Sequence, residues 1–337
     1  MQLKSEVLAR AGLGALVGAT FGFFAATAQA QGVIEVHNTM SAGGSEEAAM
    51  VRFKEIVEER SNGEFEVNVY TGGQLGDEIE VLELLNLGQT QMALTGGAFM
   101  GHYAEEYDAV TVPFVFPNWD AVEYYLLETD SGQAMQEVSR ERGNLVYLGP
   151  QMRAFRHMTS SREINTPEDL EGLRMRLPQI PVWLEVWEEL GVQAVVIPAP
   201  DIYLAMRTGQ VEAHDNSLAS PYTRQLWEVQ DYIITTSHLS FPWHWVASAS
   251  WWDSLEEDDQ QMLRDAVEEA RRHGYEVEQE MDDYYREALI EKGMTFIDPD
   301  QAPFREKAAP AVQRALAGKA EGVAEDIEAA IAATTAD

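Results

Sequence analysis

The order of hydrophobic and polar residues after residue 30 predicts alternating strands and helices. The stretches "VIEVHN" (33–38) and "EFEVNVY" (64–70) alternate apolar and polar positions, which is typical of half-buried strands. Between them, apolar residues recur at helical spacing from Ser45, which we expect to cap the helix, to a stop at Asn62-Gly63. The N-terminal half therefore reads as strand 33–38, a helix from Ser45, strand 64–70, a helix from Asp77 to Gly88 and strand 91–96.

A second unit of the same kind begins after about residue 150. Its predicted order is strand 155–160, a helix start at 166–169, strand 173–178, helix 181–190, strand 192–197, helix 201–208 and strand 211–216. One long helical pattern then covers 255–292, and Ala-rich helices cover 301–335. Strands that alternate with helices predict an α/β fold with parallel or mixed sheets. Because no Pro/Gly/Ser-rich linker separates the units, we expect the chain to cross between them inside ordered elements, as in a hinged pair.

The first 30 residues have the pattern of a secretory leader. Lys4 and Arg10 precede an apolar stretch at 11–27, and Ala28-Gln29-Ala30 has the small residues of a cleavage site. The alternative, a membrane anchor, is disfavoured because the apolar stretch contains glycine and threonine and is short for a bilayer span. We therefore expect a periplasmic protein whose leader is cleaved near Ala30.

Composition narrows the classes of function. The 337 residues include no cysteine, which excludes thiol catalysis and cysteine-based zinc sites. The net charge of −34 disfavours nucleic acid and anionic lipid as partners. The seven histidines form no HExxH or similar pair, and a nucleophile elbow, a phosphate loop and a dinucleotide fingerprint are all missing. The sequence thus predicts no metal, no cofactor and no catalytic residue.

Two arginines and one asparagine lie where strands of the second unit meet one edge. Arg176 ends one predicted strand, Arg156 lies within another, and Asn216 ends a third. Ligands of open α/β sheets sit outside the carboxyl ends of the strands, and guanidinium forks with an amide suit a carboxylate. Each residue alone is also compatible with a surface ion pair or a turn. Together they predict an anion site, whereas we expect Arg174, earlier on the Arg176 strand, to be solvated or ion-paired.

The sequence resembles the solute-binding proteins of TRAP transporters over nearly the whole chain after the leader. Three stretches carry the resemblance: "YTGGQLGDEIEVLELLNLGQTQMAL" (70–94), "FRHMTSSREINTPEDLEGLRMRLP" (155–178) and the segment from "GVQAVVI" to "TTSH" (191–238). The resemblance implies a two-domain periplasmic binding protein of the type II-like clam-shell kind, with the ligand in the cleft between the domains. The predicted helix at 255–292 fits the long helix that spans the domains in that family.

The resemblance also implies roles for individual residues. In that family the arginine that matches Arg176 pairs with the substrate carboxylate, and the residues that match Arg156 and Asn216 also reach the ligand. The match further places Thr39, Glu78 and Trp243 at the cleft. For Trp243, packing at the hinge is the alternative to an apolar or cation-attracting wall for the ligand.

Four cleft positions differ from the sialic-acid-binding branch of the family. Where that branch has an asparagine, an aspartate, a glutamate and an aromatic residue, this chain has Thr39, Glu78, Gly96 and Ala199. These differences argue against a sugar acid. A zwitterion, a short aliphatic acid and an aromatic acid all stay open.

These inferences predict the periplasmic solute-binding subunit of a TRAP-type transporter, which captures a small organic acid and delivers it to the membrane permease. We assign residues 31–153 with 242–281 to domain I and residues 154–241 with 282–337 to domain II. The expected partners are the carboxylate and the TRAP membrane subunits, with no nucleic acid, and the protein is expected to be a monomer that is not itself membrane-embedded. Two alternatives stay open: an exported enzyme acting on small organic acids, and a ligand-sensing binding protein for a membrane receptor.

Overall fold

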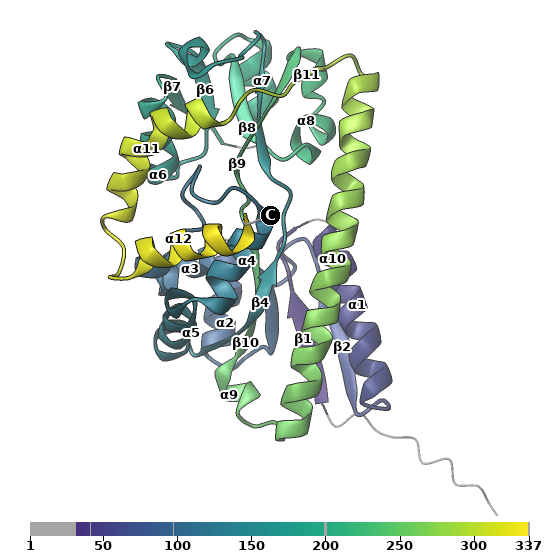
Figure 1. The fold of residues 1–337 in the computed structure, drawn as a ribbon. Coiled ribbons are helices and arrows are strands. Elements are labelled where there is room, and N and C mark those ends of the chain that lie inside the picture. Colours follow the sequence, from purple (N-terminus) through teal and green to yellow (C-terminus); the bar gives the residue numbers. More distant parts are fainter. Residues whose placement is uncertain (1–31, 41, 97, 199–200, 336–337) are drawn as a thin grey trace, which may run out of the picture.

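The computed structural model describes residues 32–40, 42–96, 98–198 and 201–335, so the predicted leader and Ala199 lie outside the described residues. The described chain forms two α/β units, one above the other in Figure 1, each built on its own sheet. The predicted α/β class is confirmed.

The N-terminal unit is built on a five-stranded mixed sheet. In it, β1 pairs in parallel with β2 and β3, while β10 runs antiparallel between β3 and β4. Alternate residues of a strand point to opposite faces, so Met92 and Leu94 join one core cluster and Ala93 joins the other. In spatial order the strands are β2 (Phe65–Tyr70), β1 (Gly32–His37), β3 (Met92–Thr95), β10 (Trp243–Ser248) and β4 (Leu145–Gln151).

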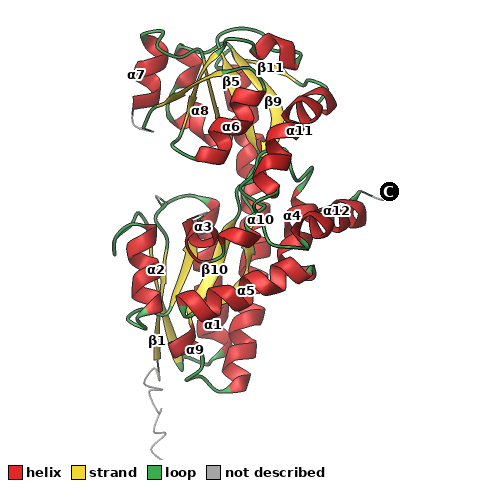
Figure 2. Cartoon of the chain, turned by 90° about the vertical axis from the view of Figure 1, so that its left-hand side faces the viewer, coloured by secondary structure: helices red, strands yellow, loops and turns green. Residues whose placement is uncertain are grey.

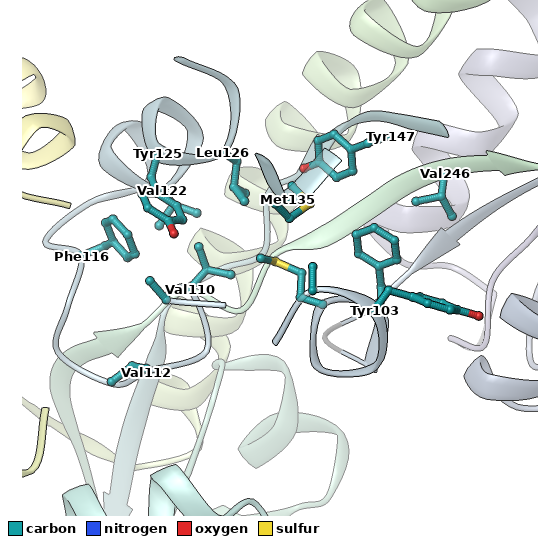
Figure 3. Close-up of a cluster of buried hydrophobic side chains, with 14 of the residues drawn as sticks. Tyr103, Val110, Val112, Phe116, Val122, Tyr125, Leu126, Met135, Tyr147 and Val246 are labelled. Atoms are coloured by element: carbon teal, nitrogen blue, oxygen red, sulfur yellow. The ribbon is translucent and has the colours of Figure 1, made fainter. Parts of the chain in front are cut away.

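Helices cover both faces of this sheet (Figure 2). On one face lie α1 (Ser45–Arg60), α9 (Ala249–Trp252) and α10 (Glu257–Glu291). On the other lie α2 (Glu78–Asn86), α3 (Ala98–Tyr103), the 3-10 turn η1 (Glu105–Tyr107), α4 (Trp119–Glu128), α5 (Asp130–Gly143) and α12 (Val323–Thr334). Figure 3 shows part of the second cluster, where Phe116, Val122, Tyr125 and Leu126 from α4 and the loop before it gather beside Val110. With both faces covered, the central strand β3 is largely apolar and buried on both sides, whereas the edge strand β2 alternates and exposes Glu66.

The second unit is built on a six-stranded mixed sheet. Its strands, in spatial order, are β11 (Thr295–Ile297), β9 (Tyr232–Leu239), β5 (Arg156–Ser160), β8 (Ala213–Asn216), β6 (Arg174–Leu177) and β7 (Gln193–Val196). Here β6 is parallel to β7 and β8, whereas β5 is antiparallel to β8 and β9. Its helices are η2 (Pro167–Leu170), α6 (Pro181–Glu189), α7 (Ile202–Arg207), α8 (Ala219–Thr223), η4 (Leu226–Glu228) and α11 (Ala302–Leu316).

Several elements connect the two units. Residues 152–155 join β4 to β5, and residues 240–242 join β9 to β10. The 35-residue helix α10 runs beside both units in Figure 1 and contacts α1 in one and α8 in the other. After α11, the chain returns to the N-terminal unit, where α12 packs against α4 and α5. The predicted domain division, which groups residues 282–337 with domain II, stays a prediction.

The loop before α4 also ties the units together. Phe114 has a φ of +67°, an uncommon value for a residue with a side chain. Its backbone N–H donates to the carbonyl of His238 at 2.6 Å, and its carbonyl accepts from the Arg305 guanidinium at 2.9 Å. Its ring packs edge-on against Trp187 in the second core. These contacts fix the strained backbone of a loop from one unit inside the other.

The local structure corrects one predicted cap and confirms another. Gly44, not Ser45, precedes the first residue of α1, and the Ser45 hydroxyl donates instead to the Glu278 carboxylate on α10. The predicted cap at Ser45 was therefore wrong, because a distant acid takes its hydroxyl. Asp77 does cap α2, with a full capping box to Glu80.

Candidate ligand-binding site

Arg174 and Arg176 project from the same face of β6 into different surroundings. Arg174 is exposed, and its Nε lies 3.1 Å from a carboxylate oxygen of Glu212, as expected for an ion-paired surface residue. Arg176 is only 4 % exposed, and its Nε donates to the carbonyl of Ile197 at 2.7 Å. Among the described residues, Arg176 forms no ion pair within 4.0 Å. A buried guanidinium without a counter-charge is expensive, so this site is suited to an incoming anion.

The charges around Arg176 are mixed. Burial lowers the pKa of Arg176, the Asp215 carboxylate opposes that shift, and the nearby Arg156 and Arg224 guanidinium groups add to it. The guanidinium groups of Arg156 and Arg176 therefore share one fully buried carboxylate, that of Asp215, in this part of the sheet edge. That balance favours binding of a further negative charge.

Arg156 and Asn216 are in direct contact. Because β5 runs antiparallel to β8, the first residue of β5 lies at the carboxyl end of β8. The Arg156 guanidinium donates to Asn216 Oδ1 at 3.0 Å, to the Asp215 carboxylate at 2.8 Å and to the Asp215 carbonyl at 2.8 Å. The structure thus brings together two of the residues that the sequence placed at one sheet edge. Arg176 lies on the neighbouring strand, opposite His214.

Asp215 and His238 form a buried layer behind Arg156, and sequence reasoning missed both. Burial would raise the pKa of Asp215, but the Arg156 guanidinium and the His238 hydrogen bond hold it well below its usual range. Burial lowers the pKa of His238 in spite of Asp215. The neutral His238 ring donates from Nε2 to Asp215 over 3.2 Å and accepts the Thr236 hydroxyl at Nδ1 over 2.9 Å. Asp215 therefore stays ionised and fixes the Arg156 guanidinium.

Trp183 supports Arg156 from another side. The guanidinium carbon lies 4.7 Å from the centre of the indole ring, within cation–π range. The indole N–H donates to the carbonyl of Thr111 at 2.8 Å, which anchors the ring to the loop that precedes α4. Arg156 is therefore positioned before any ligand arrives.

A cavity of about 190 Å³ opens beside this cluster. Arg156 and Asn216 line it from the second unit, and Trp243, the first residue of β10, lines it from the N-terminal unit. Its remaining lining residues are Met40, Arg153, Ala154, Ser217 and Phe241. The lining contains two guanidinium groups and no carboxylate. Three predicted site residues thus meet at one cavity between the units, whereas Arg176 lies outside its lining.

Thr39 and Glu78 lie together elsewhere, in a shallow hollow of about 670 Å³ on the N-terminal unit. The Glu78 carboxylate accepts the backbone N–H of Gly96 at 3.0 Å. A Cβ on Gly96 would come within 2.6 Å of that carboxylate and 3.3 Å of the Trp243 ring. The absent side chain at Gly96 therefore leaves room for both the Glu78 carboxylate and the Trp243 ring.

The described residues contain neither a metal centre nor a membrane span. No three histidine or acidic side chains among them are arranged to hold a metal ion. Burial lowers the pKa values of His157, His214 and His244 to about 3, so these side chains are neutral near pH 7. No helix within the described ranges is long and apolar enough to cross a bilayer.

Curated relatives resemble the chain over most of its length. A solute-binding protein of Roseobacter denitrificans is 28% identical over 269 residues, which cover 78% of this chain and 81% of the relative. The sialic acid-binding periplasmic protein SiaP of Vibrio cholerae is 27% identical over 290 residues, covering 85% of this chain and 89% of SiaP. The C4-dicarboxylate-binding periplasmic protein DctP of Shewanella loihica is 24% identical over 299 residues, which cover 88% of this chain and 87% of DctP.

Solved structures share the fold. A TRAP periplasmic solute-binding protein from Ochrobactrum anthropi superposes with a TM-score of 0.85 at 24% identity, covering 90% of this chain and 96% of that one. The structure of the Roseobacter denitrificans protein with bound L-galactonate gives a TM-score of 0.72 at 26% identity, and the match covers 88% of this chain and 98% of that one. These neighbours confirm the predicted two-unit clam-shell fold with its long helix. The model of the bacterial extracellular solute-binding proteins, family 7, matches residues 36–319, and the chain therefore belongs to this family of non-enzymatic TRAP transporter periplasmic solute-binding proteins.

Proposed function

We propose that this protein captures a small organic carboxylate between its two units and delivers it to the membrane subunits of a TRAP transporter. The observation that carries the proposal is the cluster of Arg156, Asp215 and Asn216 beside the buried, unpaired guanidinium of Arg176. In a chain of net charge −34, this local excess of positive charge is a feature that a ligand anion would explain.

The ligands named for relatives support a carboxylate. The relatives include a sialic acid-binding protein and a C4-dicarboxylate-binding protein, and solved neighbours hold L-galactonate and D-glucuronate. These solutes differ in size and hydroxylation, but each carries a carboxylate. The shared group is the one that a planar guanidinium fork recognises best.

We assign the carboxylate to Arg176, with Arg156 and Asn216 as further contacts. We assign Trp243, Glu78 and Thr39 to the opposite wall, on the N-terminal unit. Because the two walls belong to different units, a ligand that touches both binds the closed arrangement better and shifts the population toward it. Small-angle scattering should then show compaction on adding ligand, and no change at saturation would exclude the hinge.

The predicted leader and domain division belong to the same proposal. A protein that serves a TRAP permease has to reach the periplasm, so we expect the mature chain to begin near Gln31. Cell fractionation and N-terminal sequencing test this. Recovery of the protein in the inner membrane after a salt wash would contradict it.

The ligand itself is best found by mass spectrometry of what co-purifies, followed by a thermal-shift screen of organic acids. A ligand at a hundred times its Kd stabilises the folded state by about 2.7 kcal/mol, which gives a clear shift. Uptake of the identified acid by vesicles that contain the membrane subunits, only when this protein is added, would establish delivery. A screen in which no carboxylate stabilises the protein would overturn the proposal.

A further inference from the structure

We propose that Trp183 is a positioning residue that couples the contact between the two units to the orientation of the Arg156 guanidinium. The inference rests on the proposed function, because it concerns the affinity of the same site. Trp183 lies on α6 of the second unit, is only 3 % exposed and does not line the 190 Å³ cavity. Any effect of Trp183 on a ligand in that cavity therefore passes through the residues that it contacts.

The indole N–H of Trp183 forms a hydrogen bond across the boundary between the units. Its acceptor is the carbonyl of Thr111, at 2.8 Å, and the neighbours Val110 and Val112 are buried in a core cluster of the N-terminal unit. The Asp108 carboxylate accepts both the backbone N–H of Thr111, at 3.2 Å, and its hydroxyl, at 2.8 Å. Trp183 itself is buried in the core of the second unit. The hydrogen bond thus connects a fixed turn of one unit to a fixed ring of the other.

The ring of Trp183 also contacts residues at both connectors between the sheets. The guanidinium carbon of Arg156, the residue that follows connector 152–155, lies 4.7 Å from the centre of the indole ring. The ring of Phe241, in connector 240–242, packs edge-on against Trp183 with the ring centres 5.8 Å apart. Trp183 is therefore in contact with the loop before α4, with one connector and with the first residue after the other. A change in the arrangement of the units would reach Arg156 through this ring.

The support of Arg156 is incomplete without Trp183. Three of the five N–H donors of the guanidinium bond to Asp215 and Asn216, which leaves two for a ligand carboxylate. Because guanidinium donors lie in one plane, these bonds hold the edge of the group, and the indole ring beside it limits tilting. A guanidinium that is already ordered costs a ligand less conformational entropy on binding. Loosening Trp183 should therefore lower the affinity without removing any group that contacts the ligand.

The first test needs no ligand. In full-length protein labelled with 15N, the Nε–H signal of Arg156, assigned by its loss in Arg156→Lys, reports the mobility of the guanidinium. Trp183→Phe keeps a ring beside Arg156 but removes the N–H that bonds to Thr111, so the heteronuclear NOE of that signal should fall. An NOE equal to that of the parent overturns the inference. Should Trp183→Phe fail to fold, Asp108→Asn loosens the Thr111 turn instead, and the same two outcomes decide.

Trp187→Phe is the matched control. Trp187 lies one turn further along α6, is fully buried, and its indole nitrogen has no hydrogen-bond partner among the described residues. The same substitution there removes an N–H without breaking a bond to the other unit. We expect Trp187→Phe to leave the Arg156 NOE unchanged. A fall as large as that in Trp183→Phe would show that repacking of α6 is the cause, and would overturn the inference.

The second test measures affinity by titration calorimetry with L-galactonate, D-glucuronate and succinate. Trp183→Phe should weaken the acid that binds best by roughly 2- to 13-fold, the cost of ordering one side chain. In an Arg156→Gln background, the same substitution should change the affinity by less than about twofold, because no guanidinium remains to be placed. A purely structural role would weaken both backgrounds by the same factor, and that result overturns the inference alone. Parent protein that binds none of these acids and no other carboxylate overturns the proposed function and, with it, the role of Trp183 in affinity.

Discussion

The two units hold their buried polar groups in different ways. In the N-terminal unit, Gln151 is an example: its amide bridges the Arg271 carbonyl and the Trp245 indole N–H within a sheet packed on both faces. In the second unit, strand ends carry ionised groups, of which Arg176 and Asp215 are almost fully buried. The first arrangement satisfies the Gln151 amide within the protein, although one buried side-chain atom each of His37, Thr95, His244 and Ser248 has no hydrogen-bond partner among the described residues. In the second arrangement, the guanidinium groups of Arg156 and Arg176 share the single carboxylate of Asp215. The positive charge that remains can be balanced by a ligand anion.

This difference predicts where substitutions act. Changes at the edge of the second sheet should act on anion binding and on charge-dependent stability, whereas changes in the N-terminal unit should act mainly through packing. The expected effects below run from the largest to the smallest.

Arg176→Ala should weaken binding of the identified carboxylate by roughly a hundred- to several thousand-fold. The substitution leaves the ligand carboxylate in a drier site without its partner, a loss of about 3–5 kcal/mol at about 1.4 kcal/mol per tenfold. Arg176→Lys should restore only part, since an ammonium lacks the planar fork. Calorimetry on these variants beside Arg174→Ala, whose expected loss is under about 1 kcal/mol, provides the measurement. Binding by Arg176→Ala within tenfold of the parent, or a greater loss for Arg174→Ala, would contradict the carboxylate assignment.

Asp215→Asn should destabilise the fold by about 3 kcal/mol, the lower end for a broken buried ion pair, because Arg156 is 13 % exposed and partly hydrated. The amide keeps the shape of the carboxylate and removes its charge. Urea unfolding measures the loss, and Glu212→Gln is the matched control, since it breaks the exposed pair with Arg174 and should change stability by less than about 1 kcal/mol. Equal losses of stability in Asp215→Asn and Glu212→Gln would show that the buried ion pair stabilises the fold no more than the exposed one.

As the pH falls, the protein should begin to lose folding stability at pH values well above those at which ordinary carboxylates titrate. His157, His214 and His244 have pKa values near 3 when folded, against an ordinary value of 6.5, so the unfolded chain binds more protons between these limits. Each histidine lowers stability by about 1.4 kcal/mol per pH unit below about pH 6. Burial raises the pKa values of Asp108 and Asp282 to about 6, which acts in the opposite direction.

Urea unfolding at pH 7, 6, 5 and 4 tests this expectation. We expect a net loss of roughly 1.4–3 kcal/mol per pH unit below pH 6. In His214→Gln the slope should be shallower by about 1.4 kcal/mol per unit. A stability that stays constant from pH 7 to pH 4 would show that these histidines titrate normally.

The sequence predicted most strands and helices because their apolar spacing is regular. It did not predict that β10 enters the first sheet antiparallel, since that depends on contacts between residues far apart in the chain, such as His244 with Thr95. Of the proposed site, it predicted Arg156, Arg176 and Asn216 because strand ends in α/β sheets meet at one edge. Asp215, one residue before Asn216, gave no signal, because another acid in so acidic a chain is uninformative until its burial is known.

Gly274→Ala should destabilise the N-terminal unit by about 1–3 kcal/mol, the usual range for overpacking. Gly274 lies on α10, where a Cβ would come 2.5 Å from the Gln151 amide nitrogen and 2.8 Å from the Ala49 Cβ. Gly101→Ala is the matched control, because Gly101 is also helical and has open space around it, so alanine should stabilise by up to about 1 kcal/mol. Thermal unfolding measures both variants, and a neutral Gly274→Ala would show that the helix can shift without cost.

Thr39→Val should have the smallest effect, a less than tenfold weakening of carboxylate binding. The substitution keeps the shape of the side chain and removes one hydroxyl, and a neutral hydrogen bond contributes about 0.5–1.5 kcal/mol, which corresponds to roughly tenfold at most. Thr39 lines the shallow hollow of the N-terminal unit rather than the cavity beside Arg156. Asn216→Ala is the comparison from the other wall, and its loss should be greater, because Asn216 also accepts a hydrogen bond from the Arg156 guanidinium. Calorimetry with the same acid ranks the two. A greater loss of carboxylate affinity in Thr39→Val than in Asn216→Ala would show that the N-terminal unit, and not the edge of the second sheet, makes the stronger contacts with the ligand.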